Sequence, residues 1–211
     1  MSNSIIKQLL TPSAICLLFL GGLLLTGCKQ NTNTPKPKGY PRIDFPERGY
    51  QEFDSTCPFS FQYPSYASIV PNQSKDAQDC WINILYKPLG AKLYLSYQDF
   101  NNQQQLNTLK EDARTLVYKH TVKASQIKES KIKQDTQQVE GIFYELAGNA
   151  ATAIQFYVTD ADQHYLRGSL YFEVEPNRDS LDPVIDYLKK DLVKMINTLE
   201  WKQGSKAMSN Q

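Results

Sequence analysis

Residues 165–174 read YLRGSLYFEV, and their apolar and polar positions alternate without a break. A period of two is typical of a β-strand that buries one of its faces. One set consists of Leu166, Gly168, Leu170, Phe172 and Val174, and the other of Tyr165, Arg167, Ser169, Tyr171 and Glu173. The pattern therefore predicts a strand with Arg167 on its polar face, where Arg167 either pairs with Glu145 across the sheet or is an exposed contact.

Two further runs with the same period precede this strand. Their apolar positions are Ile142, Tyr144 and Leu146 in the first run, and Ile154, Phe156 and Val158 in the second. The connections at residues 148–149 and 160–163 are short and rich in residues that favour turns. We therefore expect the three strands to form an antiparallel meander.

Helical patterns flank the meander on both sides. In residues 102–123, apolar side chains recur at steps of three and four residues, which is typical of an amphipathic helix. Near the C-terminus, Asp182 is suited to an N-cap and Pro183 to the first helical position. Trp201 is expected to close the domain. The apolar stripe of this last helix consists of Ile185, Leu188, Leu192, Ile196 and Leu199.

Shorter strands are expected upstream. Phe59, Phe61 and Tyr63 alternate with polar residues and are followed by Pro64, which ends the strand. Residues 81–86 and 92–97 predict a hairpin around residues 88–90, and residues 71–79 predict a polar loop.

An extended strap is predicted for the segment before these strands, because residues 39–54 mix proline, charge and aromatic side chains without a clear period. It is either a lid that completes the core or a surface that docks to a partner protein. The candidate partner-binding residues are Tyr40, Arg42, Tyr50 and, in the meander, Arg167.

These elements predict the α+β class. An antiparallel sheet and two amphipathic helices can bury their apolar faces only against each other. The order of the elements resembles the Mog1/PsbP sandwich. We expect a single domain over residues 40–203 and a loose tail over residues 204–211.

The N-terminus predicts export and lipidation. An apolar run at residues 14–25 follows a short segment with Lys7, and it is shorter than the about 20 residues of a membrane-spanning helix. Leu25-Thr26-Gly27-Cys28 then matches a lipobox, so residues 1–27 are expected to be a lipoprotein signal peptide and Cys28 to carry the acyl chains that bind the membrane. The alternative is an uncleaved signal anchor.

Residues 28–39 form the lipidated cysteine and a flexible tether, because they contain no large apolar side chain. The tether has no acidic residue after the cysteine. We therefore expect the domain to face the periplasm from the inner or outer membrane.

Two cysteines remain for the folded domain, Cys57 and Cys80. In an oxidising compartment such a pair predicts a disulfide, worth about 3 kcal/mol by the chain-entropy argument. The alternatives are two reduced thiols or half of a metal site. A metal site is not expected, because the chain has no CxxC motif and only two histidines.

No catalytic motif is present. The sequence lacks a nucleophile elbow, a phosphate-binding glycine loop, a dinucleotide fingerprint and HExxH. His120 is interpreted as a boundary residue of its helix, and His164 as part of a solvated turn with Asp160 and Asp162. A hydrolase that uses His164 and Ser169 is a third, weaker hypothesis. We expect a protein that is not an enzyme and has no cofactor.

Charge argues against nucleic acid as a partner. The formal net charge is +1, and residues 1–27 contribute one cation and no acid, so the mature chain is close to neutral. A nucleic-acid-binding protein needs a basic face.

Several stretches together resemble the gliding motility lipoprotein GldD family of Bacteroidetes. They are KPKGYPRIDFPERGYQEFD, CPFSFQYPSYASI, CWINI, KLYLSYQD, ARTLVYKHTVKASQI, HYLRGSLYFEVEPN and the closing DPVIDYL and WK. The resemblance spans about residues 36–202. It implies an envelope lipoprotein needed for gliding and for the associated type IX secretion machinery, whose other envelope proteins are its partners. Residues 36–40 and Arg167-Gly168-Ser169 match the family pattern, and the resemblance implies no catalytic residue.

Two functions are compatible with these observations. The first is an accessory or scaffold lipoprotein of the gliding and secretion apparatus, acting through protein contacts. The second is a periplasmic module that binds a small ligand, a lipid or a glycan, in an aromatic cleft between sheet and helix. The aromatic residues expected there are Tyr144, Tyr157, Tyr165 and Tyr171.

Overall fold

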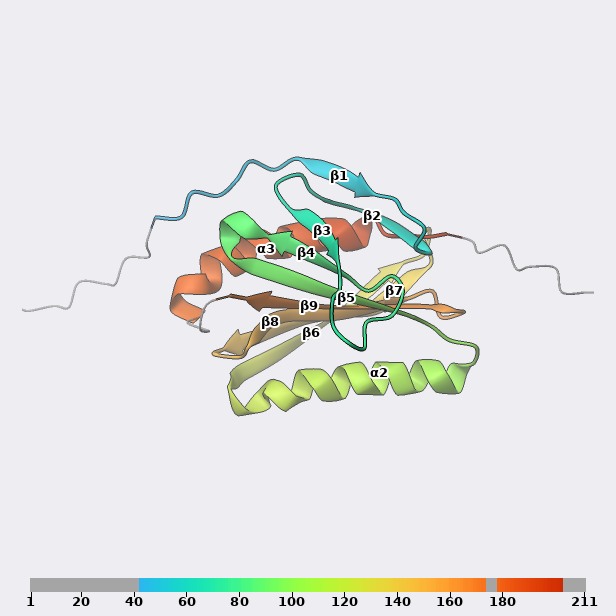
Figure 1. The fold of residues 1–211 in the computed structure, drawn as a ribbon. Coiled ribbons are helices and arrows are strands. Elements are labelled where there is room, and N and C mark those ends of the chain that lie inside the picture. The colour runs from blue at the N-terminus through green and yellow to red at the C-terminus, as the bar shows by residue number, and fades with distance from the viewer. Residues whose placement is uncertain (1–41, 174–177, 203–211) are drawn as a thin grey trace, which may run out of the picture. The chain divides into compact units, whose positions relative to one another are not determined.

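The computed structural model describes residues 42–173 and 178–202. The predicted signal peptide, Cys28, the tether, Tyr40 and the tail at residues 204–211 lie outside these ranges. Within them, a large antiparallel sheet, a small antiparallel sheet and two α-helices account for the regular structure (Figure 1). The predicted α+β class is therefore confirmed.

The large sheet has seven strands in the order β3-β4-β5-β9-β8-β7-β6, and every neighbouring pair is antiparallel. Its strands are β3 Ser68–Pro71, β4 Ile82–Tyr86, β5 Ala91–Asp99, β6 Ala124–Gln134, β7 Val139–Gly148, β8 Thr152–Thr159 and β9 His164–Phe172. The small sheet has the order β1-β2-β10. Its strands are β1 Tyr50–Phe53, β2 Phe59–Pro64 and β10 Glu200–Trp201.

The α-helices lie on opposite faces of the large sheet (Figure 1). They are α2 Gln103–Tyr118 and α3 Arg178–Asn197, and short 3₁₀ helices span η2 Lys87–Leu89 and η3 Lys119–Val122. One apolar cluster joins the sheet to α3 and β2, and a second joins the sheet to α2. Because the strands alternate, residues 143 and 156 belong to the first cluster while residues 144 and 157 belong to the second.

Most predicted elements are present. The meander is formed by β7, β8 and β9, and the hairpin by β4 and β5, which turn through η2 and Gly90 in the left-handed conformation. Asn102 caps α2 by accepting a hydrogen bond from the Gln105 backbone N–H at 2.9 Å. The stripe of the last helix is buried from Ile185 to Leu199.

The predicted elements need correction in two respects. The strands β1, β3, β6 and β10 were not expected, and β6 escapes the periodicity argument because it is an edge strand whose side chains are mostly exposed. Helix α3 begins at Arg178, so Asp182 and Pro183 lie inside it and do not mark its start. A proline this close to the N-terminus removes only one early backbone hydrogen bond, which packing of the following stripe offsets.

The strap packs onto α3. Residues 42–49 carry no regular structure, and the Phe45 ring stacks on the Tyr187 ring with centroids 4.5 Å apart. The Arg48 guanidinium lies 3.9 Å from the centroid of the same Tyr187 ring. Arg42 is exposed and forms an ion pair with Asp44 at 3.1 Å. These contacts support the lid interpretation for the part of the strap that is described.

Asp191 on α3 fixes the strap at its end. Its side chain is fully buried and accepts hydrogen bonds from the hydroxyls of Tyr50 at 2.9 Å and Tyr66 at 2.5 Å, while Arg48 Nε lies 3.3 Å away. A buried carboxylate is tolerated only when it is paired and hydrogen-bonded in this way. Burial and then the bond to Asp191 raise the pKa of Tyr50 to about 12. The Tyr50 hydroxyl is thus directed inward.

We predict that Asp191→Ala lowers the free energy of unfolding by about 3 kcal/mol, because three donors lose their buried acceptor. Urea unfolding followed by tyrosine and tryptophan fluorescence measures the loss. The matched control is Asp186→Ala, an exposed carboxylate on the same helix, which should change stability by less than about 0.5 kcal/mol. Equal stability of the two variants would contradict the role of Asp191.

Candidate functional site

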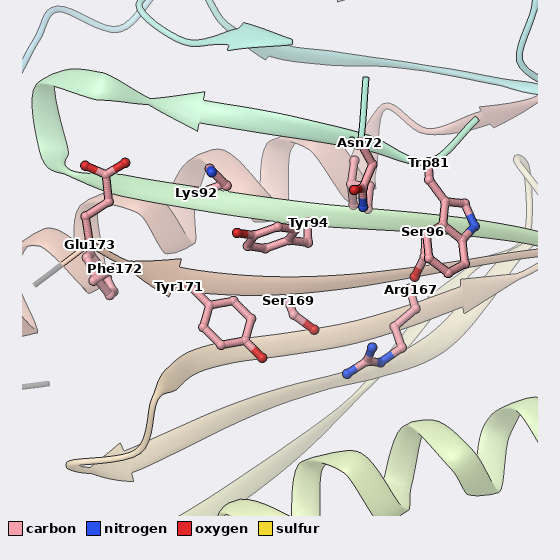
Figure 2. Close-up of a pocket in the computed structure, with 11 residues that line it drawn as sticks. Asn72, Trp81, Lys92, Tyr94, Ser96, Arg167, Ser169, Tyr171, Phe172 and Glu173 are labelled. Carbon is pink, nitrogen blue, oxygen red and sulfur yellow. The ribbon is translucent and has the colours of Figure 1, made fainter. Parts of the chain in front are cut away.

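An open cleft of about 580 Å³ lies on the α2-facing side of the large sheet, over strands β5 and β9 (Figure 2). Pockets of this size are in the range that holds small ligands. The cleft is lined by Asn72, Trp81, Lys92, Tyr94, Leu95, Ser96, Arg167, Ser169, Tyr171, Phe172 and Glu173.

The cleft exists because α2 covers only part of this face. Beneath α2, Tyr144, Tyr157 and Tyr165 are buried, and the Tyr165 hydroxyl donates to the Leu109 carbonyl at 3.1 Å. The predicted aromatic cleft between sheet and helix is therefore filled by core side chains. Of the four tyrosines expected there, Tyr171 alone lines the observed cleft, which lies beside the helix.

Strand register sets the pattern of side chains on the cleft floor. Ser96 is paired with Arg167, Tyr94 with Ser169, and Lys92 with Tyr171. Side chains of directly paired residues lie on the same face of a sheet. Figure 2 shows Trp81 and Arg167 at one end of the cleft, and Lys92 and Glu173 at the other.

The aromatic part of the floor is a pair of tyrosines. The rings of Tyr94 and Tyr171 meet edge to face with centroids 5.5 Å apart, and Lys92 Nζ lies 5.4 Å from the Tyr94 centroid. Tyr94 is 38% exposed, which is high for so large an aromatic side chain. The cleft therefore offers ring surface to solvent.

Arg167 does not pair with Glu145, so that sequence-based alternative is wrong. Glu145 lies on the opposite face of the sheet, where its carboxylate contacts Lys189 Nζ at 2.5 Å and Lys128 Nζ at 3.5 Å. Arg167 instead donates from Nη2 to the Gln155 Oε1 at 2.7 Å. The strand register places the two side chains on opposite faces, because Glu145 is paired with Ile154 and Arg167 with Tyr157. This register could not be read from the sequence.

The Arg167 end of the cleft is electropositive. Burial lowers the pKa of Arg167, and among the described residues no carboxylate forms an ion pair with it. Burial and then the charge of Arg167 also lower the pKa of His120. A cation held in a concave site in this way favours an anionic group beside it.

A disulfide supports the wall that Trp81 forms at the Arg167 end of the cleft. Cys57 and Cys80 are bonded in the structure, with their Cα atoms 5.5 Å apart. Trp81, the next residue, donates from Nε1 to the Tyr97 carbonyl at 2.8 Å, and its own carbonyl accepts from the Asn72 N–H at 2.9 Å. The bridge thus joins the β3–β4 loop, and with it Trp81, to the segment before β2.

His164 is buried, so its interpretation as a solvated turn residue is wrong. Its ring stacks on Trp201 with centroids 5.3 Å apart, and its Nδ1 lies 2.8 Å from the Tyr97 hydroxyl. Its Nε2 lies 3.0 Å from the Gln163 side-chain nitrogen. Burial lowers the pKa of His164, despite the nearby charge of Asp160.

The turn before His164 is closed by Asp160. One oxygen of this carboxylate accepts hydrogen bonds from the backbone N–H groups of Asp162, Gln163 and His164 at 2.8 to 3.0 Å. The aspartate therefore has a structural role in the turn. Among the described residues, no group of three or more His, Cys, Asp or Glu side chains could hold a metal ion.

The hypothetical pairing of His164 with Ser169 is excluded by geometry. The two residues are five positions apart on one strand, so their side chains leave opposite faces of the sheet. Ser169 is buried and donates to the Gln155 Oε1 at 3.4 Å, whereas His164 contacts Trp201 on the other side.

The sequence reasoning singled out Arg167 but missed the residues around it. Trp81, Tyr94 and Ser96 were treated only as strand positions, and Ser169 was considered only as a partner of His164 and as part of the family pattern. The alternation in residues 92–97 places Lys92, Tyr94 and Ser96 on one face, which could have indicated a shared surface. Their convergence on Arg167 depends on strand pairing between β5 and β9.

Comparison with known proteins identifies the family. Residues 30–201 match the family described as gliding motility lipoprotein GldD. The chain belongs to this family. The sequence-based resemblance to GldD is therefore confirmed, and the chain is assigned to a lipoprotein family related to gliding motility. A comparison with curated proteins gives no match.

Among solved structures, this GldD-family chain is similar to cyanobacterial PsbP (CyanoP) from Synechocystis sp. PCC 6803. The two are 13% identical, with a TM-score of 0.45, and the match covers 74% of this chain and 94% of that one. In the part of the chain that is described, neither helix is long and apolar enough to cross a membrane.

We predict that replacing both cysteines, Cys57→Ser with Cys80→Ser, lowers the free energy of unfolding by about 3 kcal/mol. The cause is the restored freedom of the loop between them in the unfolded chain. Chemical denaturation measures the change, and the unmodified protein with a reducing agent should shift to the same midpoint. If the double variant and the oxidised protein unfold together, the bridge contributes nothing.

We also predict a loss of stability below about pH 6.5 that depends on the two histidines. A folded-state pKa below the ordinary value of 6.5 means that the unfolded chain binds the proton more readily. The contribution of the two histidines to stability is therefore fully present above that pH and is lost as pH falls through their folded-state pKa. The free energy of unfolding is measured at pH 7.5 and 5.5. Its change between the two pH values should be smaller for His164→Gln than for the unmodified protein, and His120→Gln is measured in parallel.

Proposed function

We propose that this protein is a non-enzymatic accessory lipoprotein of the gliding motility and type IX secretion machinery. Acyl chains on Cys28 would anchor it to a membrane of the cell envelope, and the domain would face the periplasm. The observation that carries the proposal is the family match over residues 30–201, which spans all of the described residues except the last. The neutral composition and the lipobox are compatible with it.

The architecture supports a scaffold role. The strap that leads from the proposed tether is held to α3 by Arg48, Tyr50 and Asp191, and the segment before β2 is joined to the β3–β4 loop by the disulfide. These contacts hold the strap rigidly on the domain, so a partner protein can bind to a surface of fixed shape. The exposed strap residues Arg42 and Phe45 remain available for protein contacts.

A second candidate function is small-ligand binding, and the cleft favours it. It is open, it has the size of a ligand site, and it joins the exposed Tyr94 ring to a cation. Binding and scaffolding are compatible, since the cleft and the strap involve different faces of the large sheet.

The scaffold proposal predicts that deletion of the gene impairs both spreading on agar and export of a type IX reporter. The unmodified gene should restore both. A Cys28→Ser gene should restore neither, because the product would lack its anchor. The abundance of the Cys28→Ser protein is checked by immunoblot. In a separate experiment, the unmodified protein should accumulate as a longer precursor when globomycin blocks signal cleavage. Normal reporter export in the deletion strain would contradict the proposal.

A further inference from the structure

We infer that the cleft over β5 and β9 binds an acidic sugar, with the sugar carboxylate on the Arg167 guanidinium and the sugar ring against Tyr94. This inference rests on the second candidate function and names its ligand class. The scaffold role does not depend on it.

The first argument is the state of Arg167. A guanidinium has five N–H donors, and the structure gives this one a single hydrogen bond, to the neutral Gln155 amide oxygen at 2.7 Å. The described residues supply no carboxylate partner. Arg167 therefore keeps donors for a planar, two-oxygen anion, and a carboxylate matches that geometry with two parallel hydrogen bonds.

The second argument is the position of Arg167 relative to hydroxyl groups. Ser96 on β5 is paired directly with Arg167 on β9, and Ser169 follows Arg167 by two residues on β9. Both serines line the cleft. A hydroxyl can donate and accept, so these two groups can contact ring hydroxyls of a ligand whose carboxylate lies on Arg167.

The third argument is the aromatic floor. Tyr94 and Tyr171 meet edge to face, so their rings present surfaces in different directions, and Trp81 forms the wall at the Arg167 end. Sugar rings carry C–H groups on their faces and hydroxyls on their edges. A site that joins aromatic surface to a few polar groups is complementary to both.

Two buried polar atoms beside the floor have no hydrogen-bond partner among the residues that the structure describes. They are the Gln155 Nε2 and the Asn83 Oδ1. Gln155 is paired with Ser169, and Asn83 is paired with Tyr94, so both residues lie in the row that crosses the cleft. Buried groups of this kind are usually hydrogen-bonded, and polar groups of a ligand or its hydration shell are suitable partners.

The opposite end of the cleft limits the charge of the ligand. Glu173 lines that end together with Lys92, and the Glu173 backbone is fixed by a hydrogen bond to the Gly90 carbonyl at 2.9 Å. The Glu173 carboxylate offsets the charge of Lys92 there, so this end offers no net positive charge to a second anionic group. This asymmetry favours a ligand with one carboxylate over a polyanion such as a nucleotide.

The test uses the full lipidated chain, purified in a polyoxyethylene detergent that contains no sugar. Isothermal titration calorimetry is carried out with D-galacturonate, with D-galactose as the neutral counterpart, and with inorganic phosphate. We expect saturable binding of galacturonate, with galactose and phosphate each at least about tenfold weaker, because a hydrogen-bonded charge pair and the ring contact are both required. Equal binding of galactose would overturn carboxylate recognition, and equal binding of phosphate would overturn sugar recognition.

Variants assign the binding to this cleft. Arg167→Gln should weaken galacturonate binding by about tenfold or more, and Arg167→Lys should restore it only in part, because lysine keeps the charge but lacks the planar fork. The matched control is Arg114→Gln, an exposed arginine on α2 that does not line the cleft, and it should bind normally.

Tyr94→Ala provides a second variant in case Arg167→Gln does not fold, since Tyr94 is 38% exposed and its loss leaves the core intact. It should also weaken galacturonate binding. The inference is overturned if no saturable binding is seen, or if Tyr94→Ala and the folded Arg167 variants bind as the unmodified protein does. These outcomes concern purified protein, so they are distinct from a normal phenotype in the deletion strain.

Discussion

Along β9 the pleat of the strand directs Leu166 and Leu170 toward α3, and Arg167 and Ser169 toward the opposite face. Gly168 lies between them on the core side, and a Cβ atom there would come within 2.2 Å of the Phe156 ring. The glycine therefore lets the Phe156 ring pack directly against the strand backbone. The Arg-Gly-Ser sequence thus combines a core contact on one face with two polar cleft residues on the other.

The core and the cleft are consequences of the same sheet. α3 and the small sheet cover one face, and α2 covers only the strands toward β6 on the other face. Had α2 lain over β5, Tyr94 would be buried as Tyr144 and Tyr165 are. Partial coverage leaves the Tyr94 ring exposed beside Arg167, which has no carboxylate partner among the described residues, and exposed apolar surface often marks a site for a ligand or a partner.

Two local constraints hold the N-terminal part of the domain. Asp191 accepts hydrogen bonds from the hydroxyls of Tyr50 and Tyr66 and pairs with the guanidinium of Arg48, and the Cys57–Cys80 bridge joins the segment before β2 to the loop that carries Trp81. For a lipoprotein, force on the proposed anchor would reach the domain through the strap. Buried hydrogen bonds to α3 and a covalent bond are suited to resist it.

The sequence by itself determined the local elements, because periods of two and of about 3.6 residues are properties of neighbouring positions. It predicted the meander, the β4–β5 hairpin and the buried stripe from Ile185 to Leu199, and its resemblance to GldD was confirmed. It also predicted the pairing of Cys57 with Cys80 that the structure contains.

Only the tertiary structure decided which residues meet. It placed Glu145 on the face opposite Arg167, buried His164 between Tyr97 and Trp201, and brought Tyr94 beside Tyr171. Each of these outcomes depends on strand register or on which part of the sheet a helix covers. Both are set by contacts between segments far apart in the chain, so no local pattern of residues encodes them.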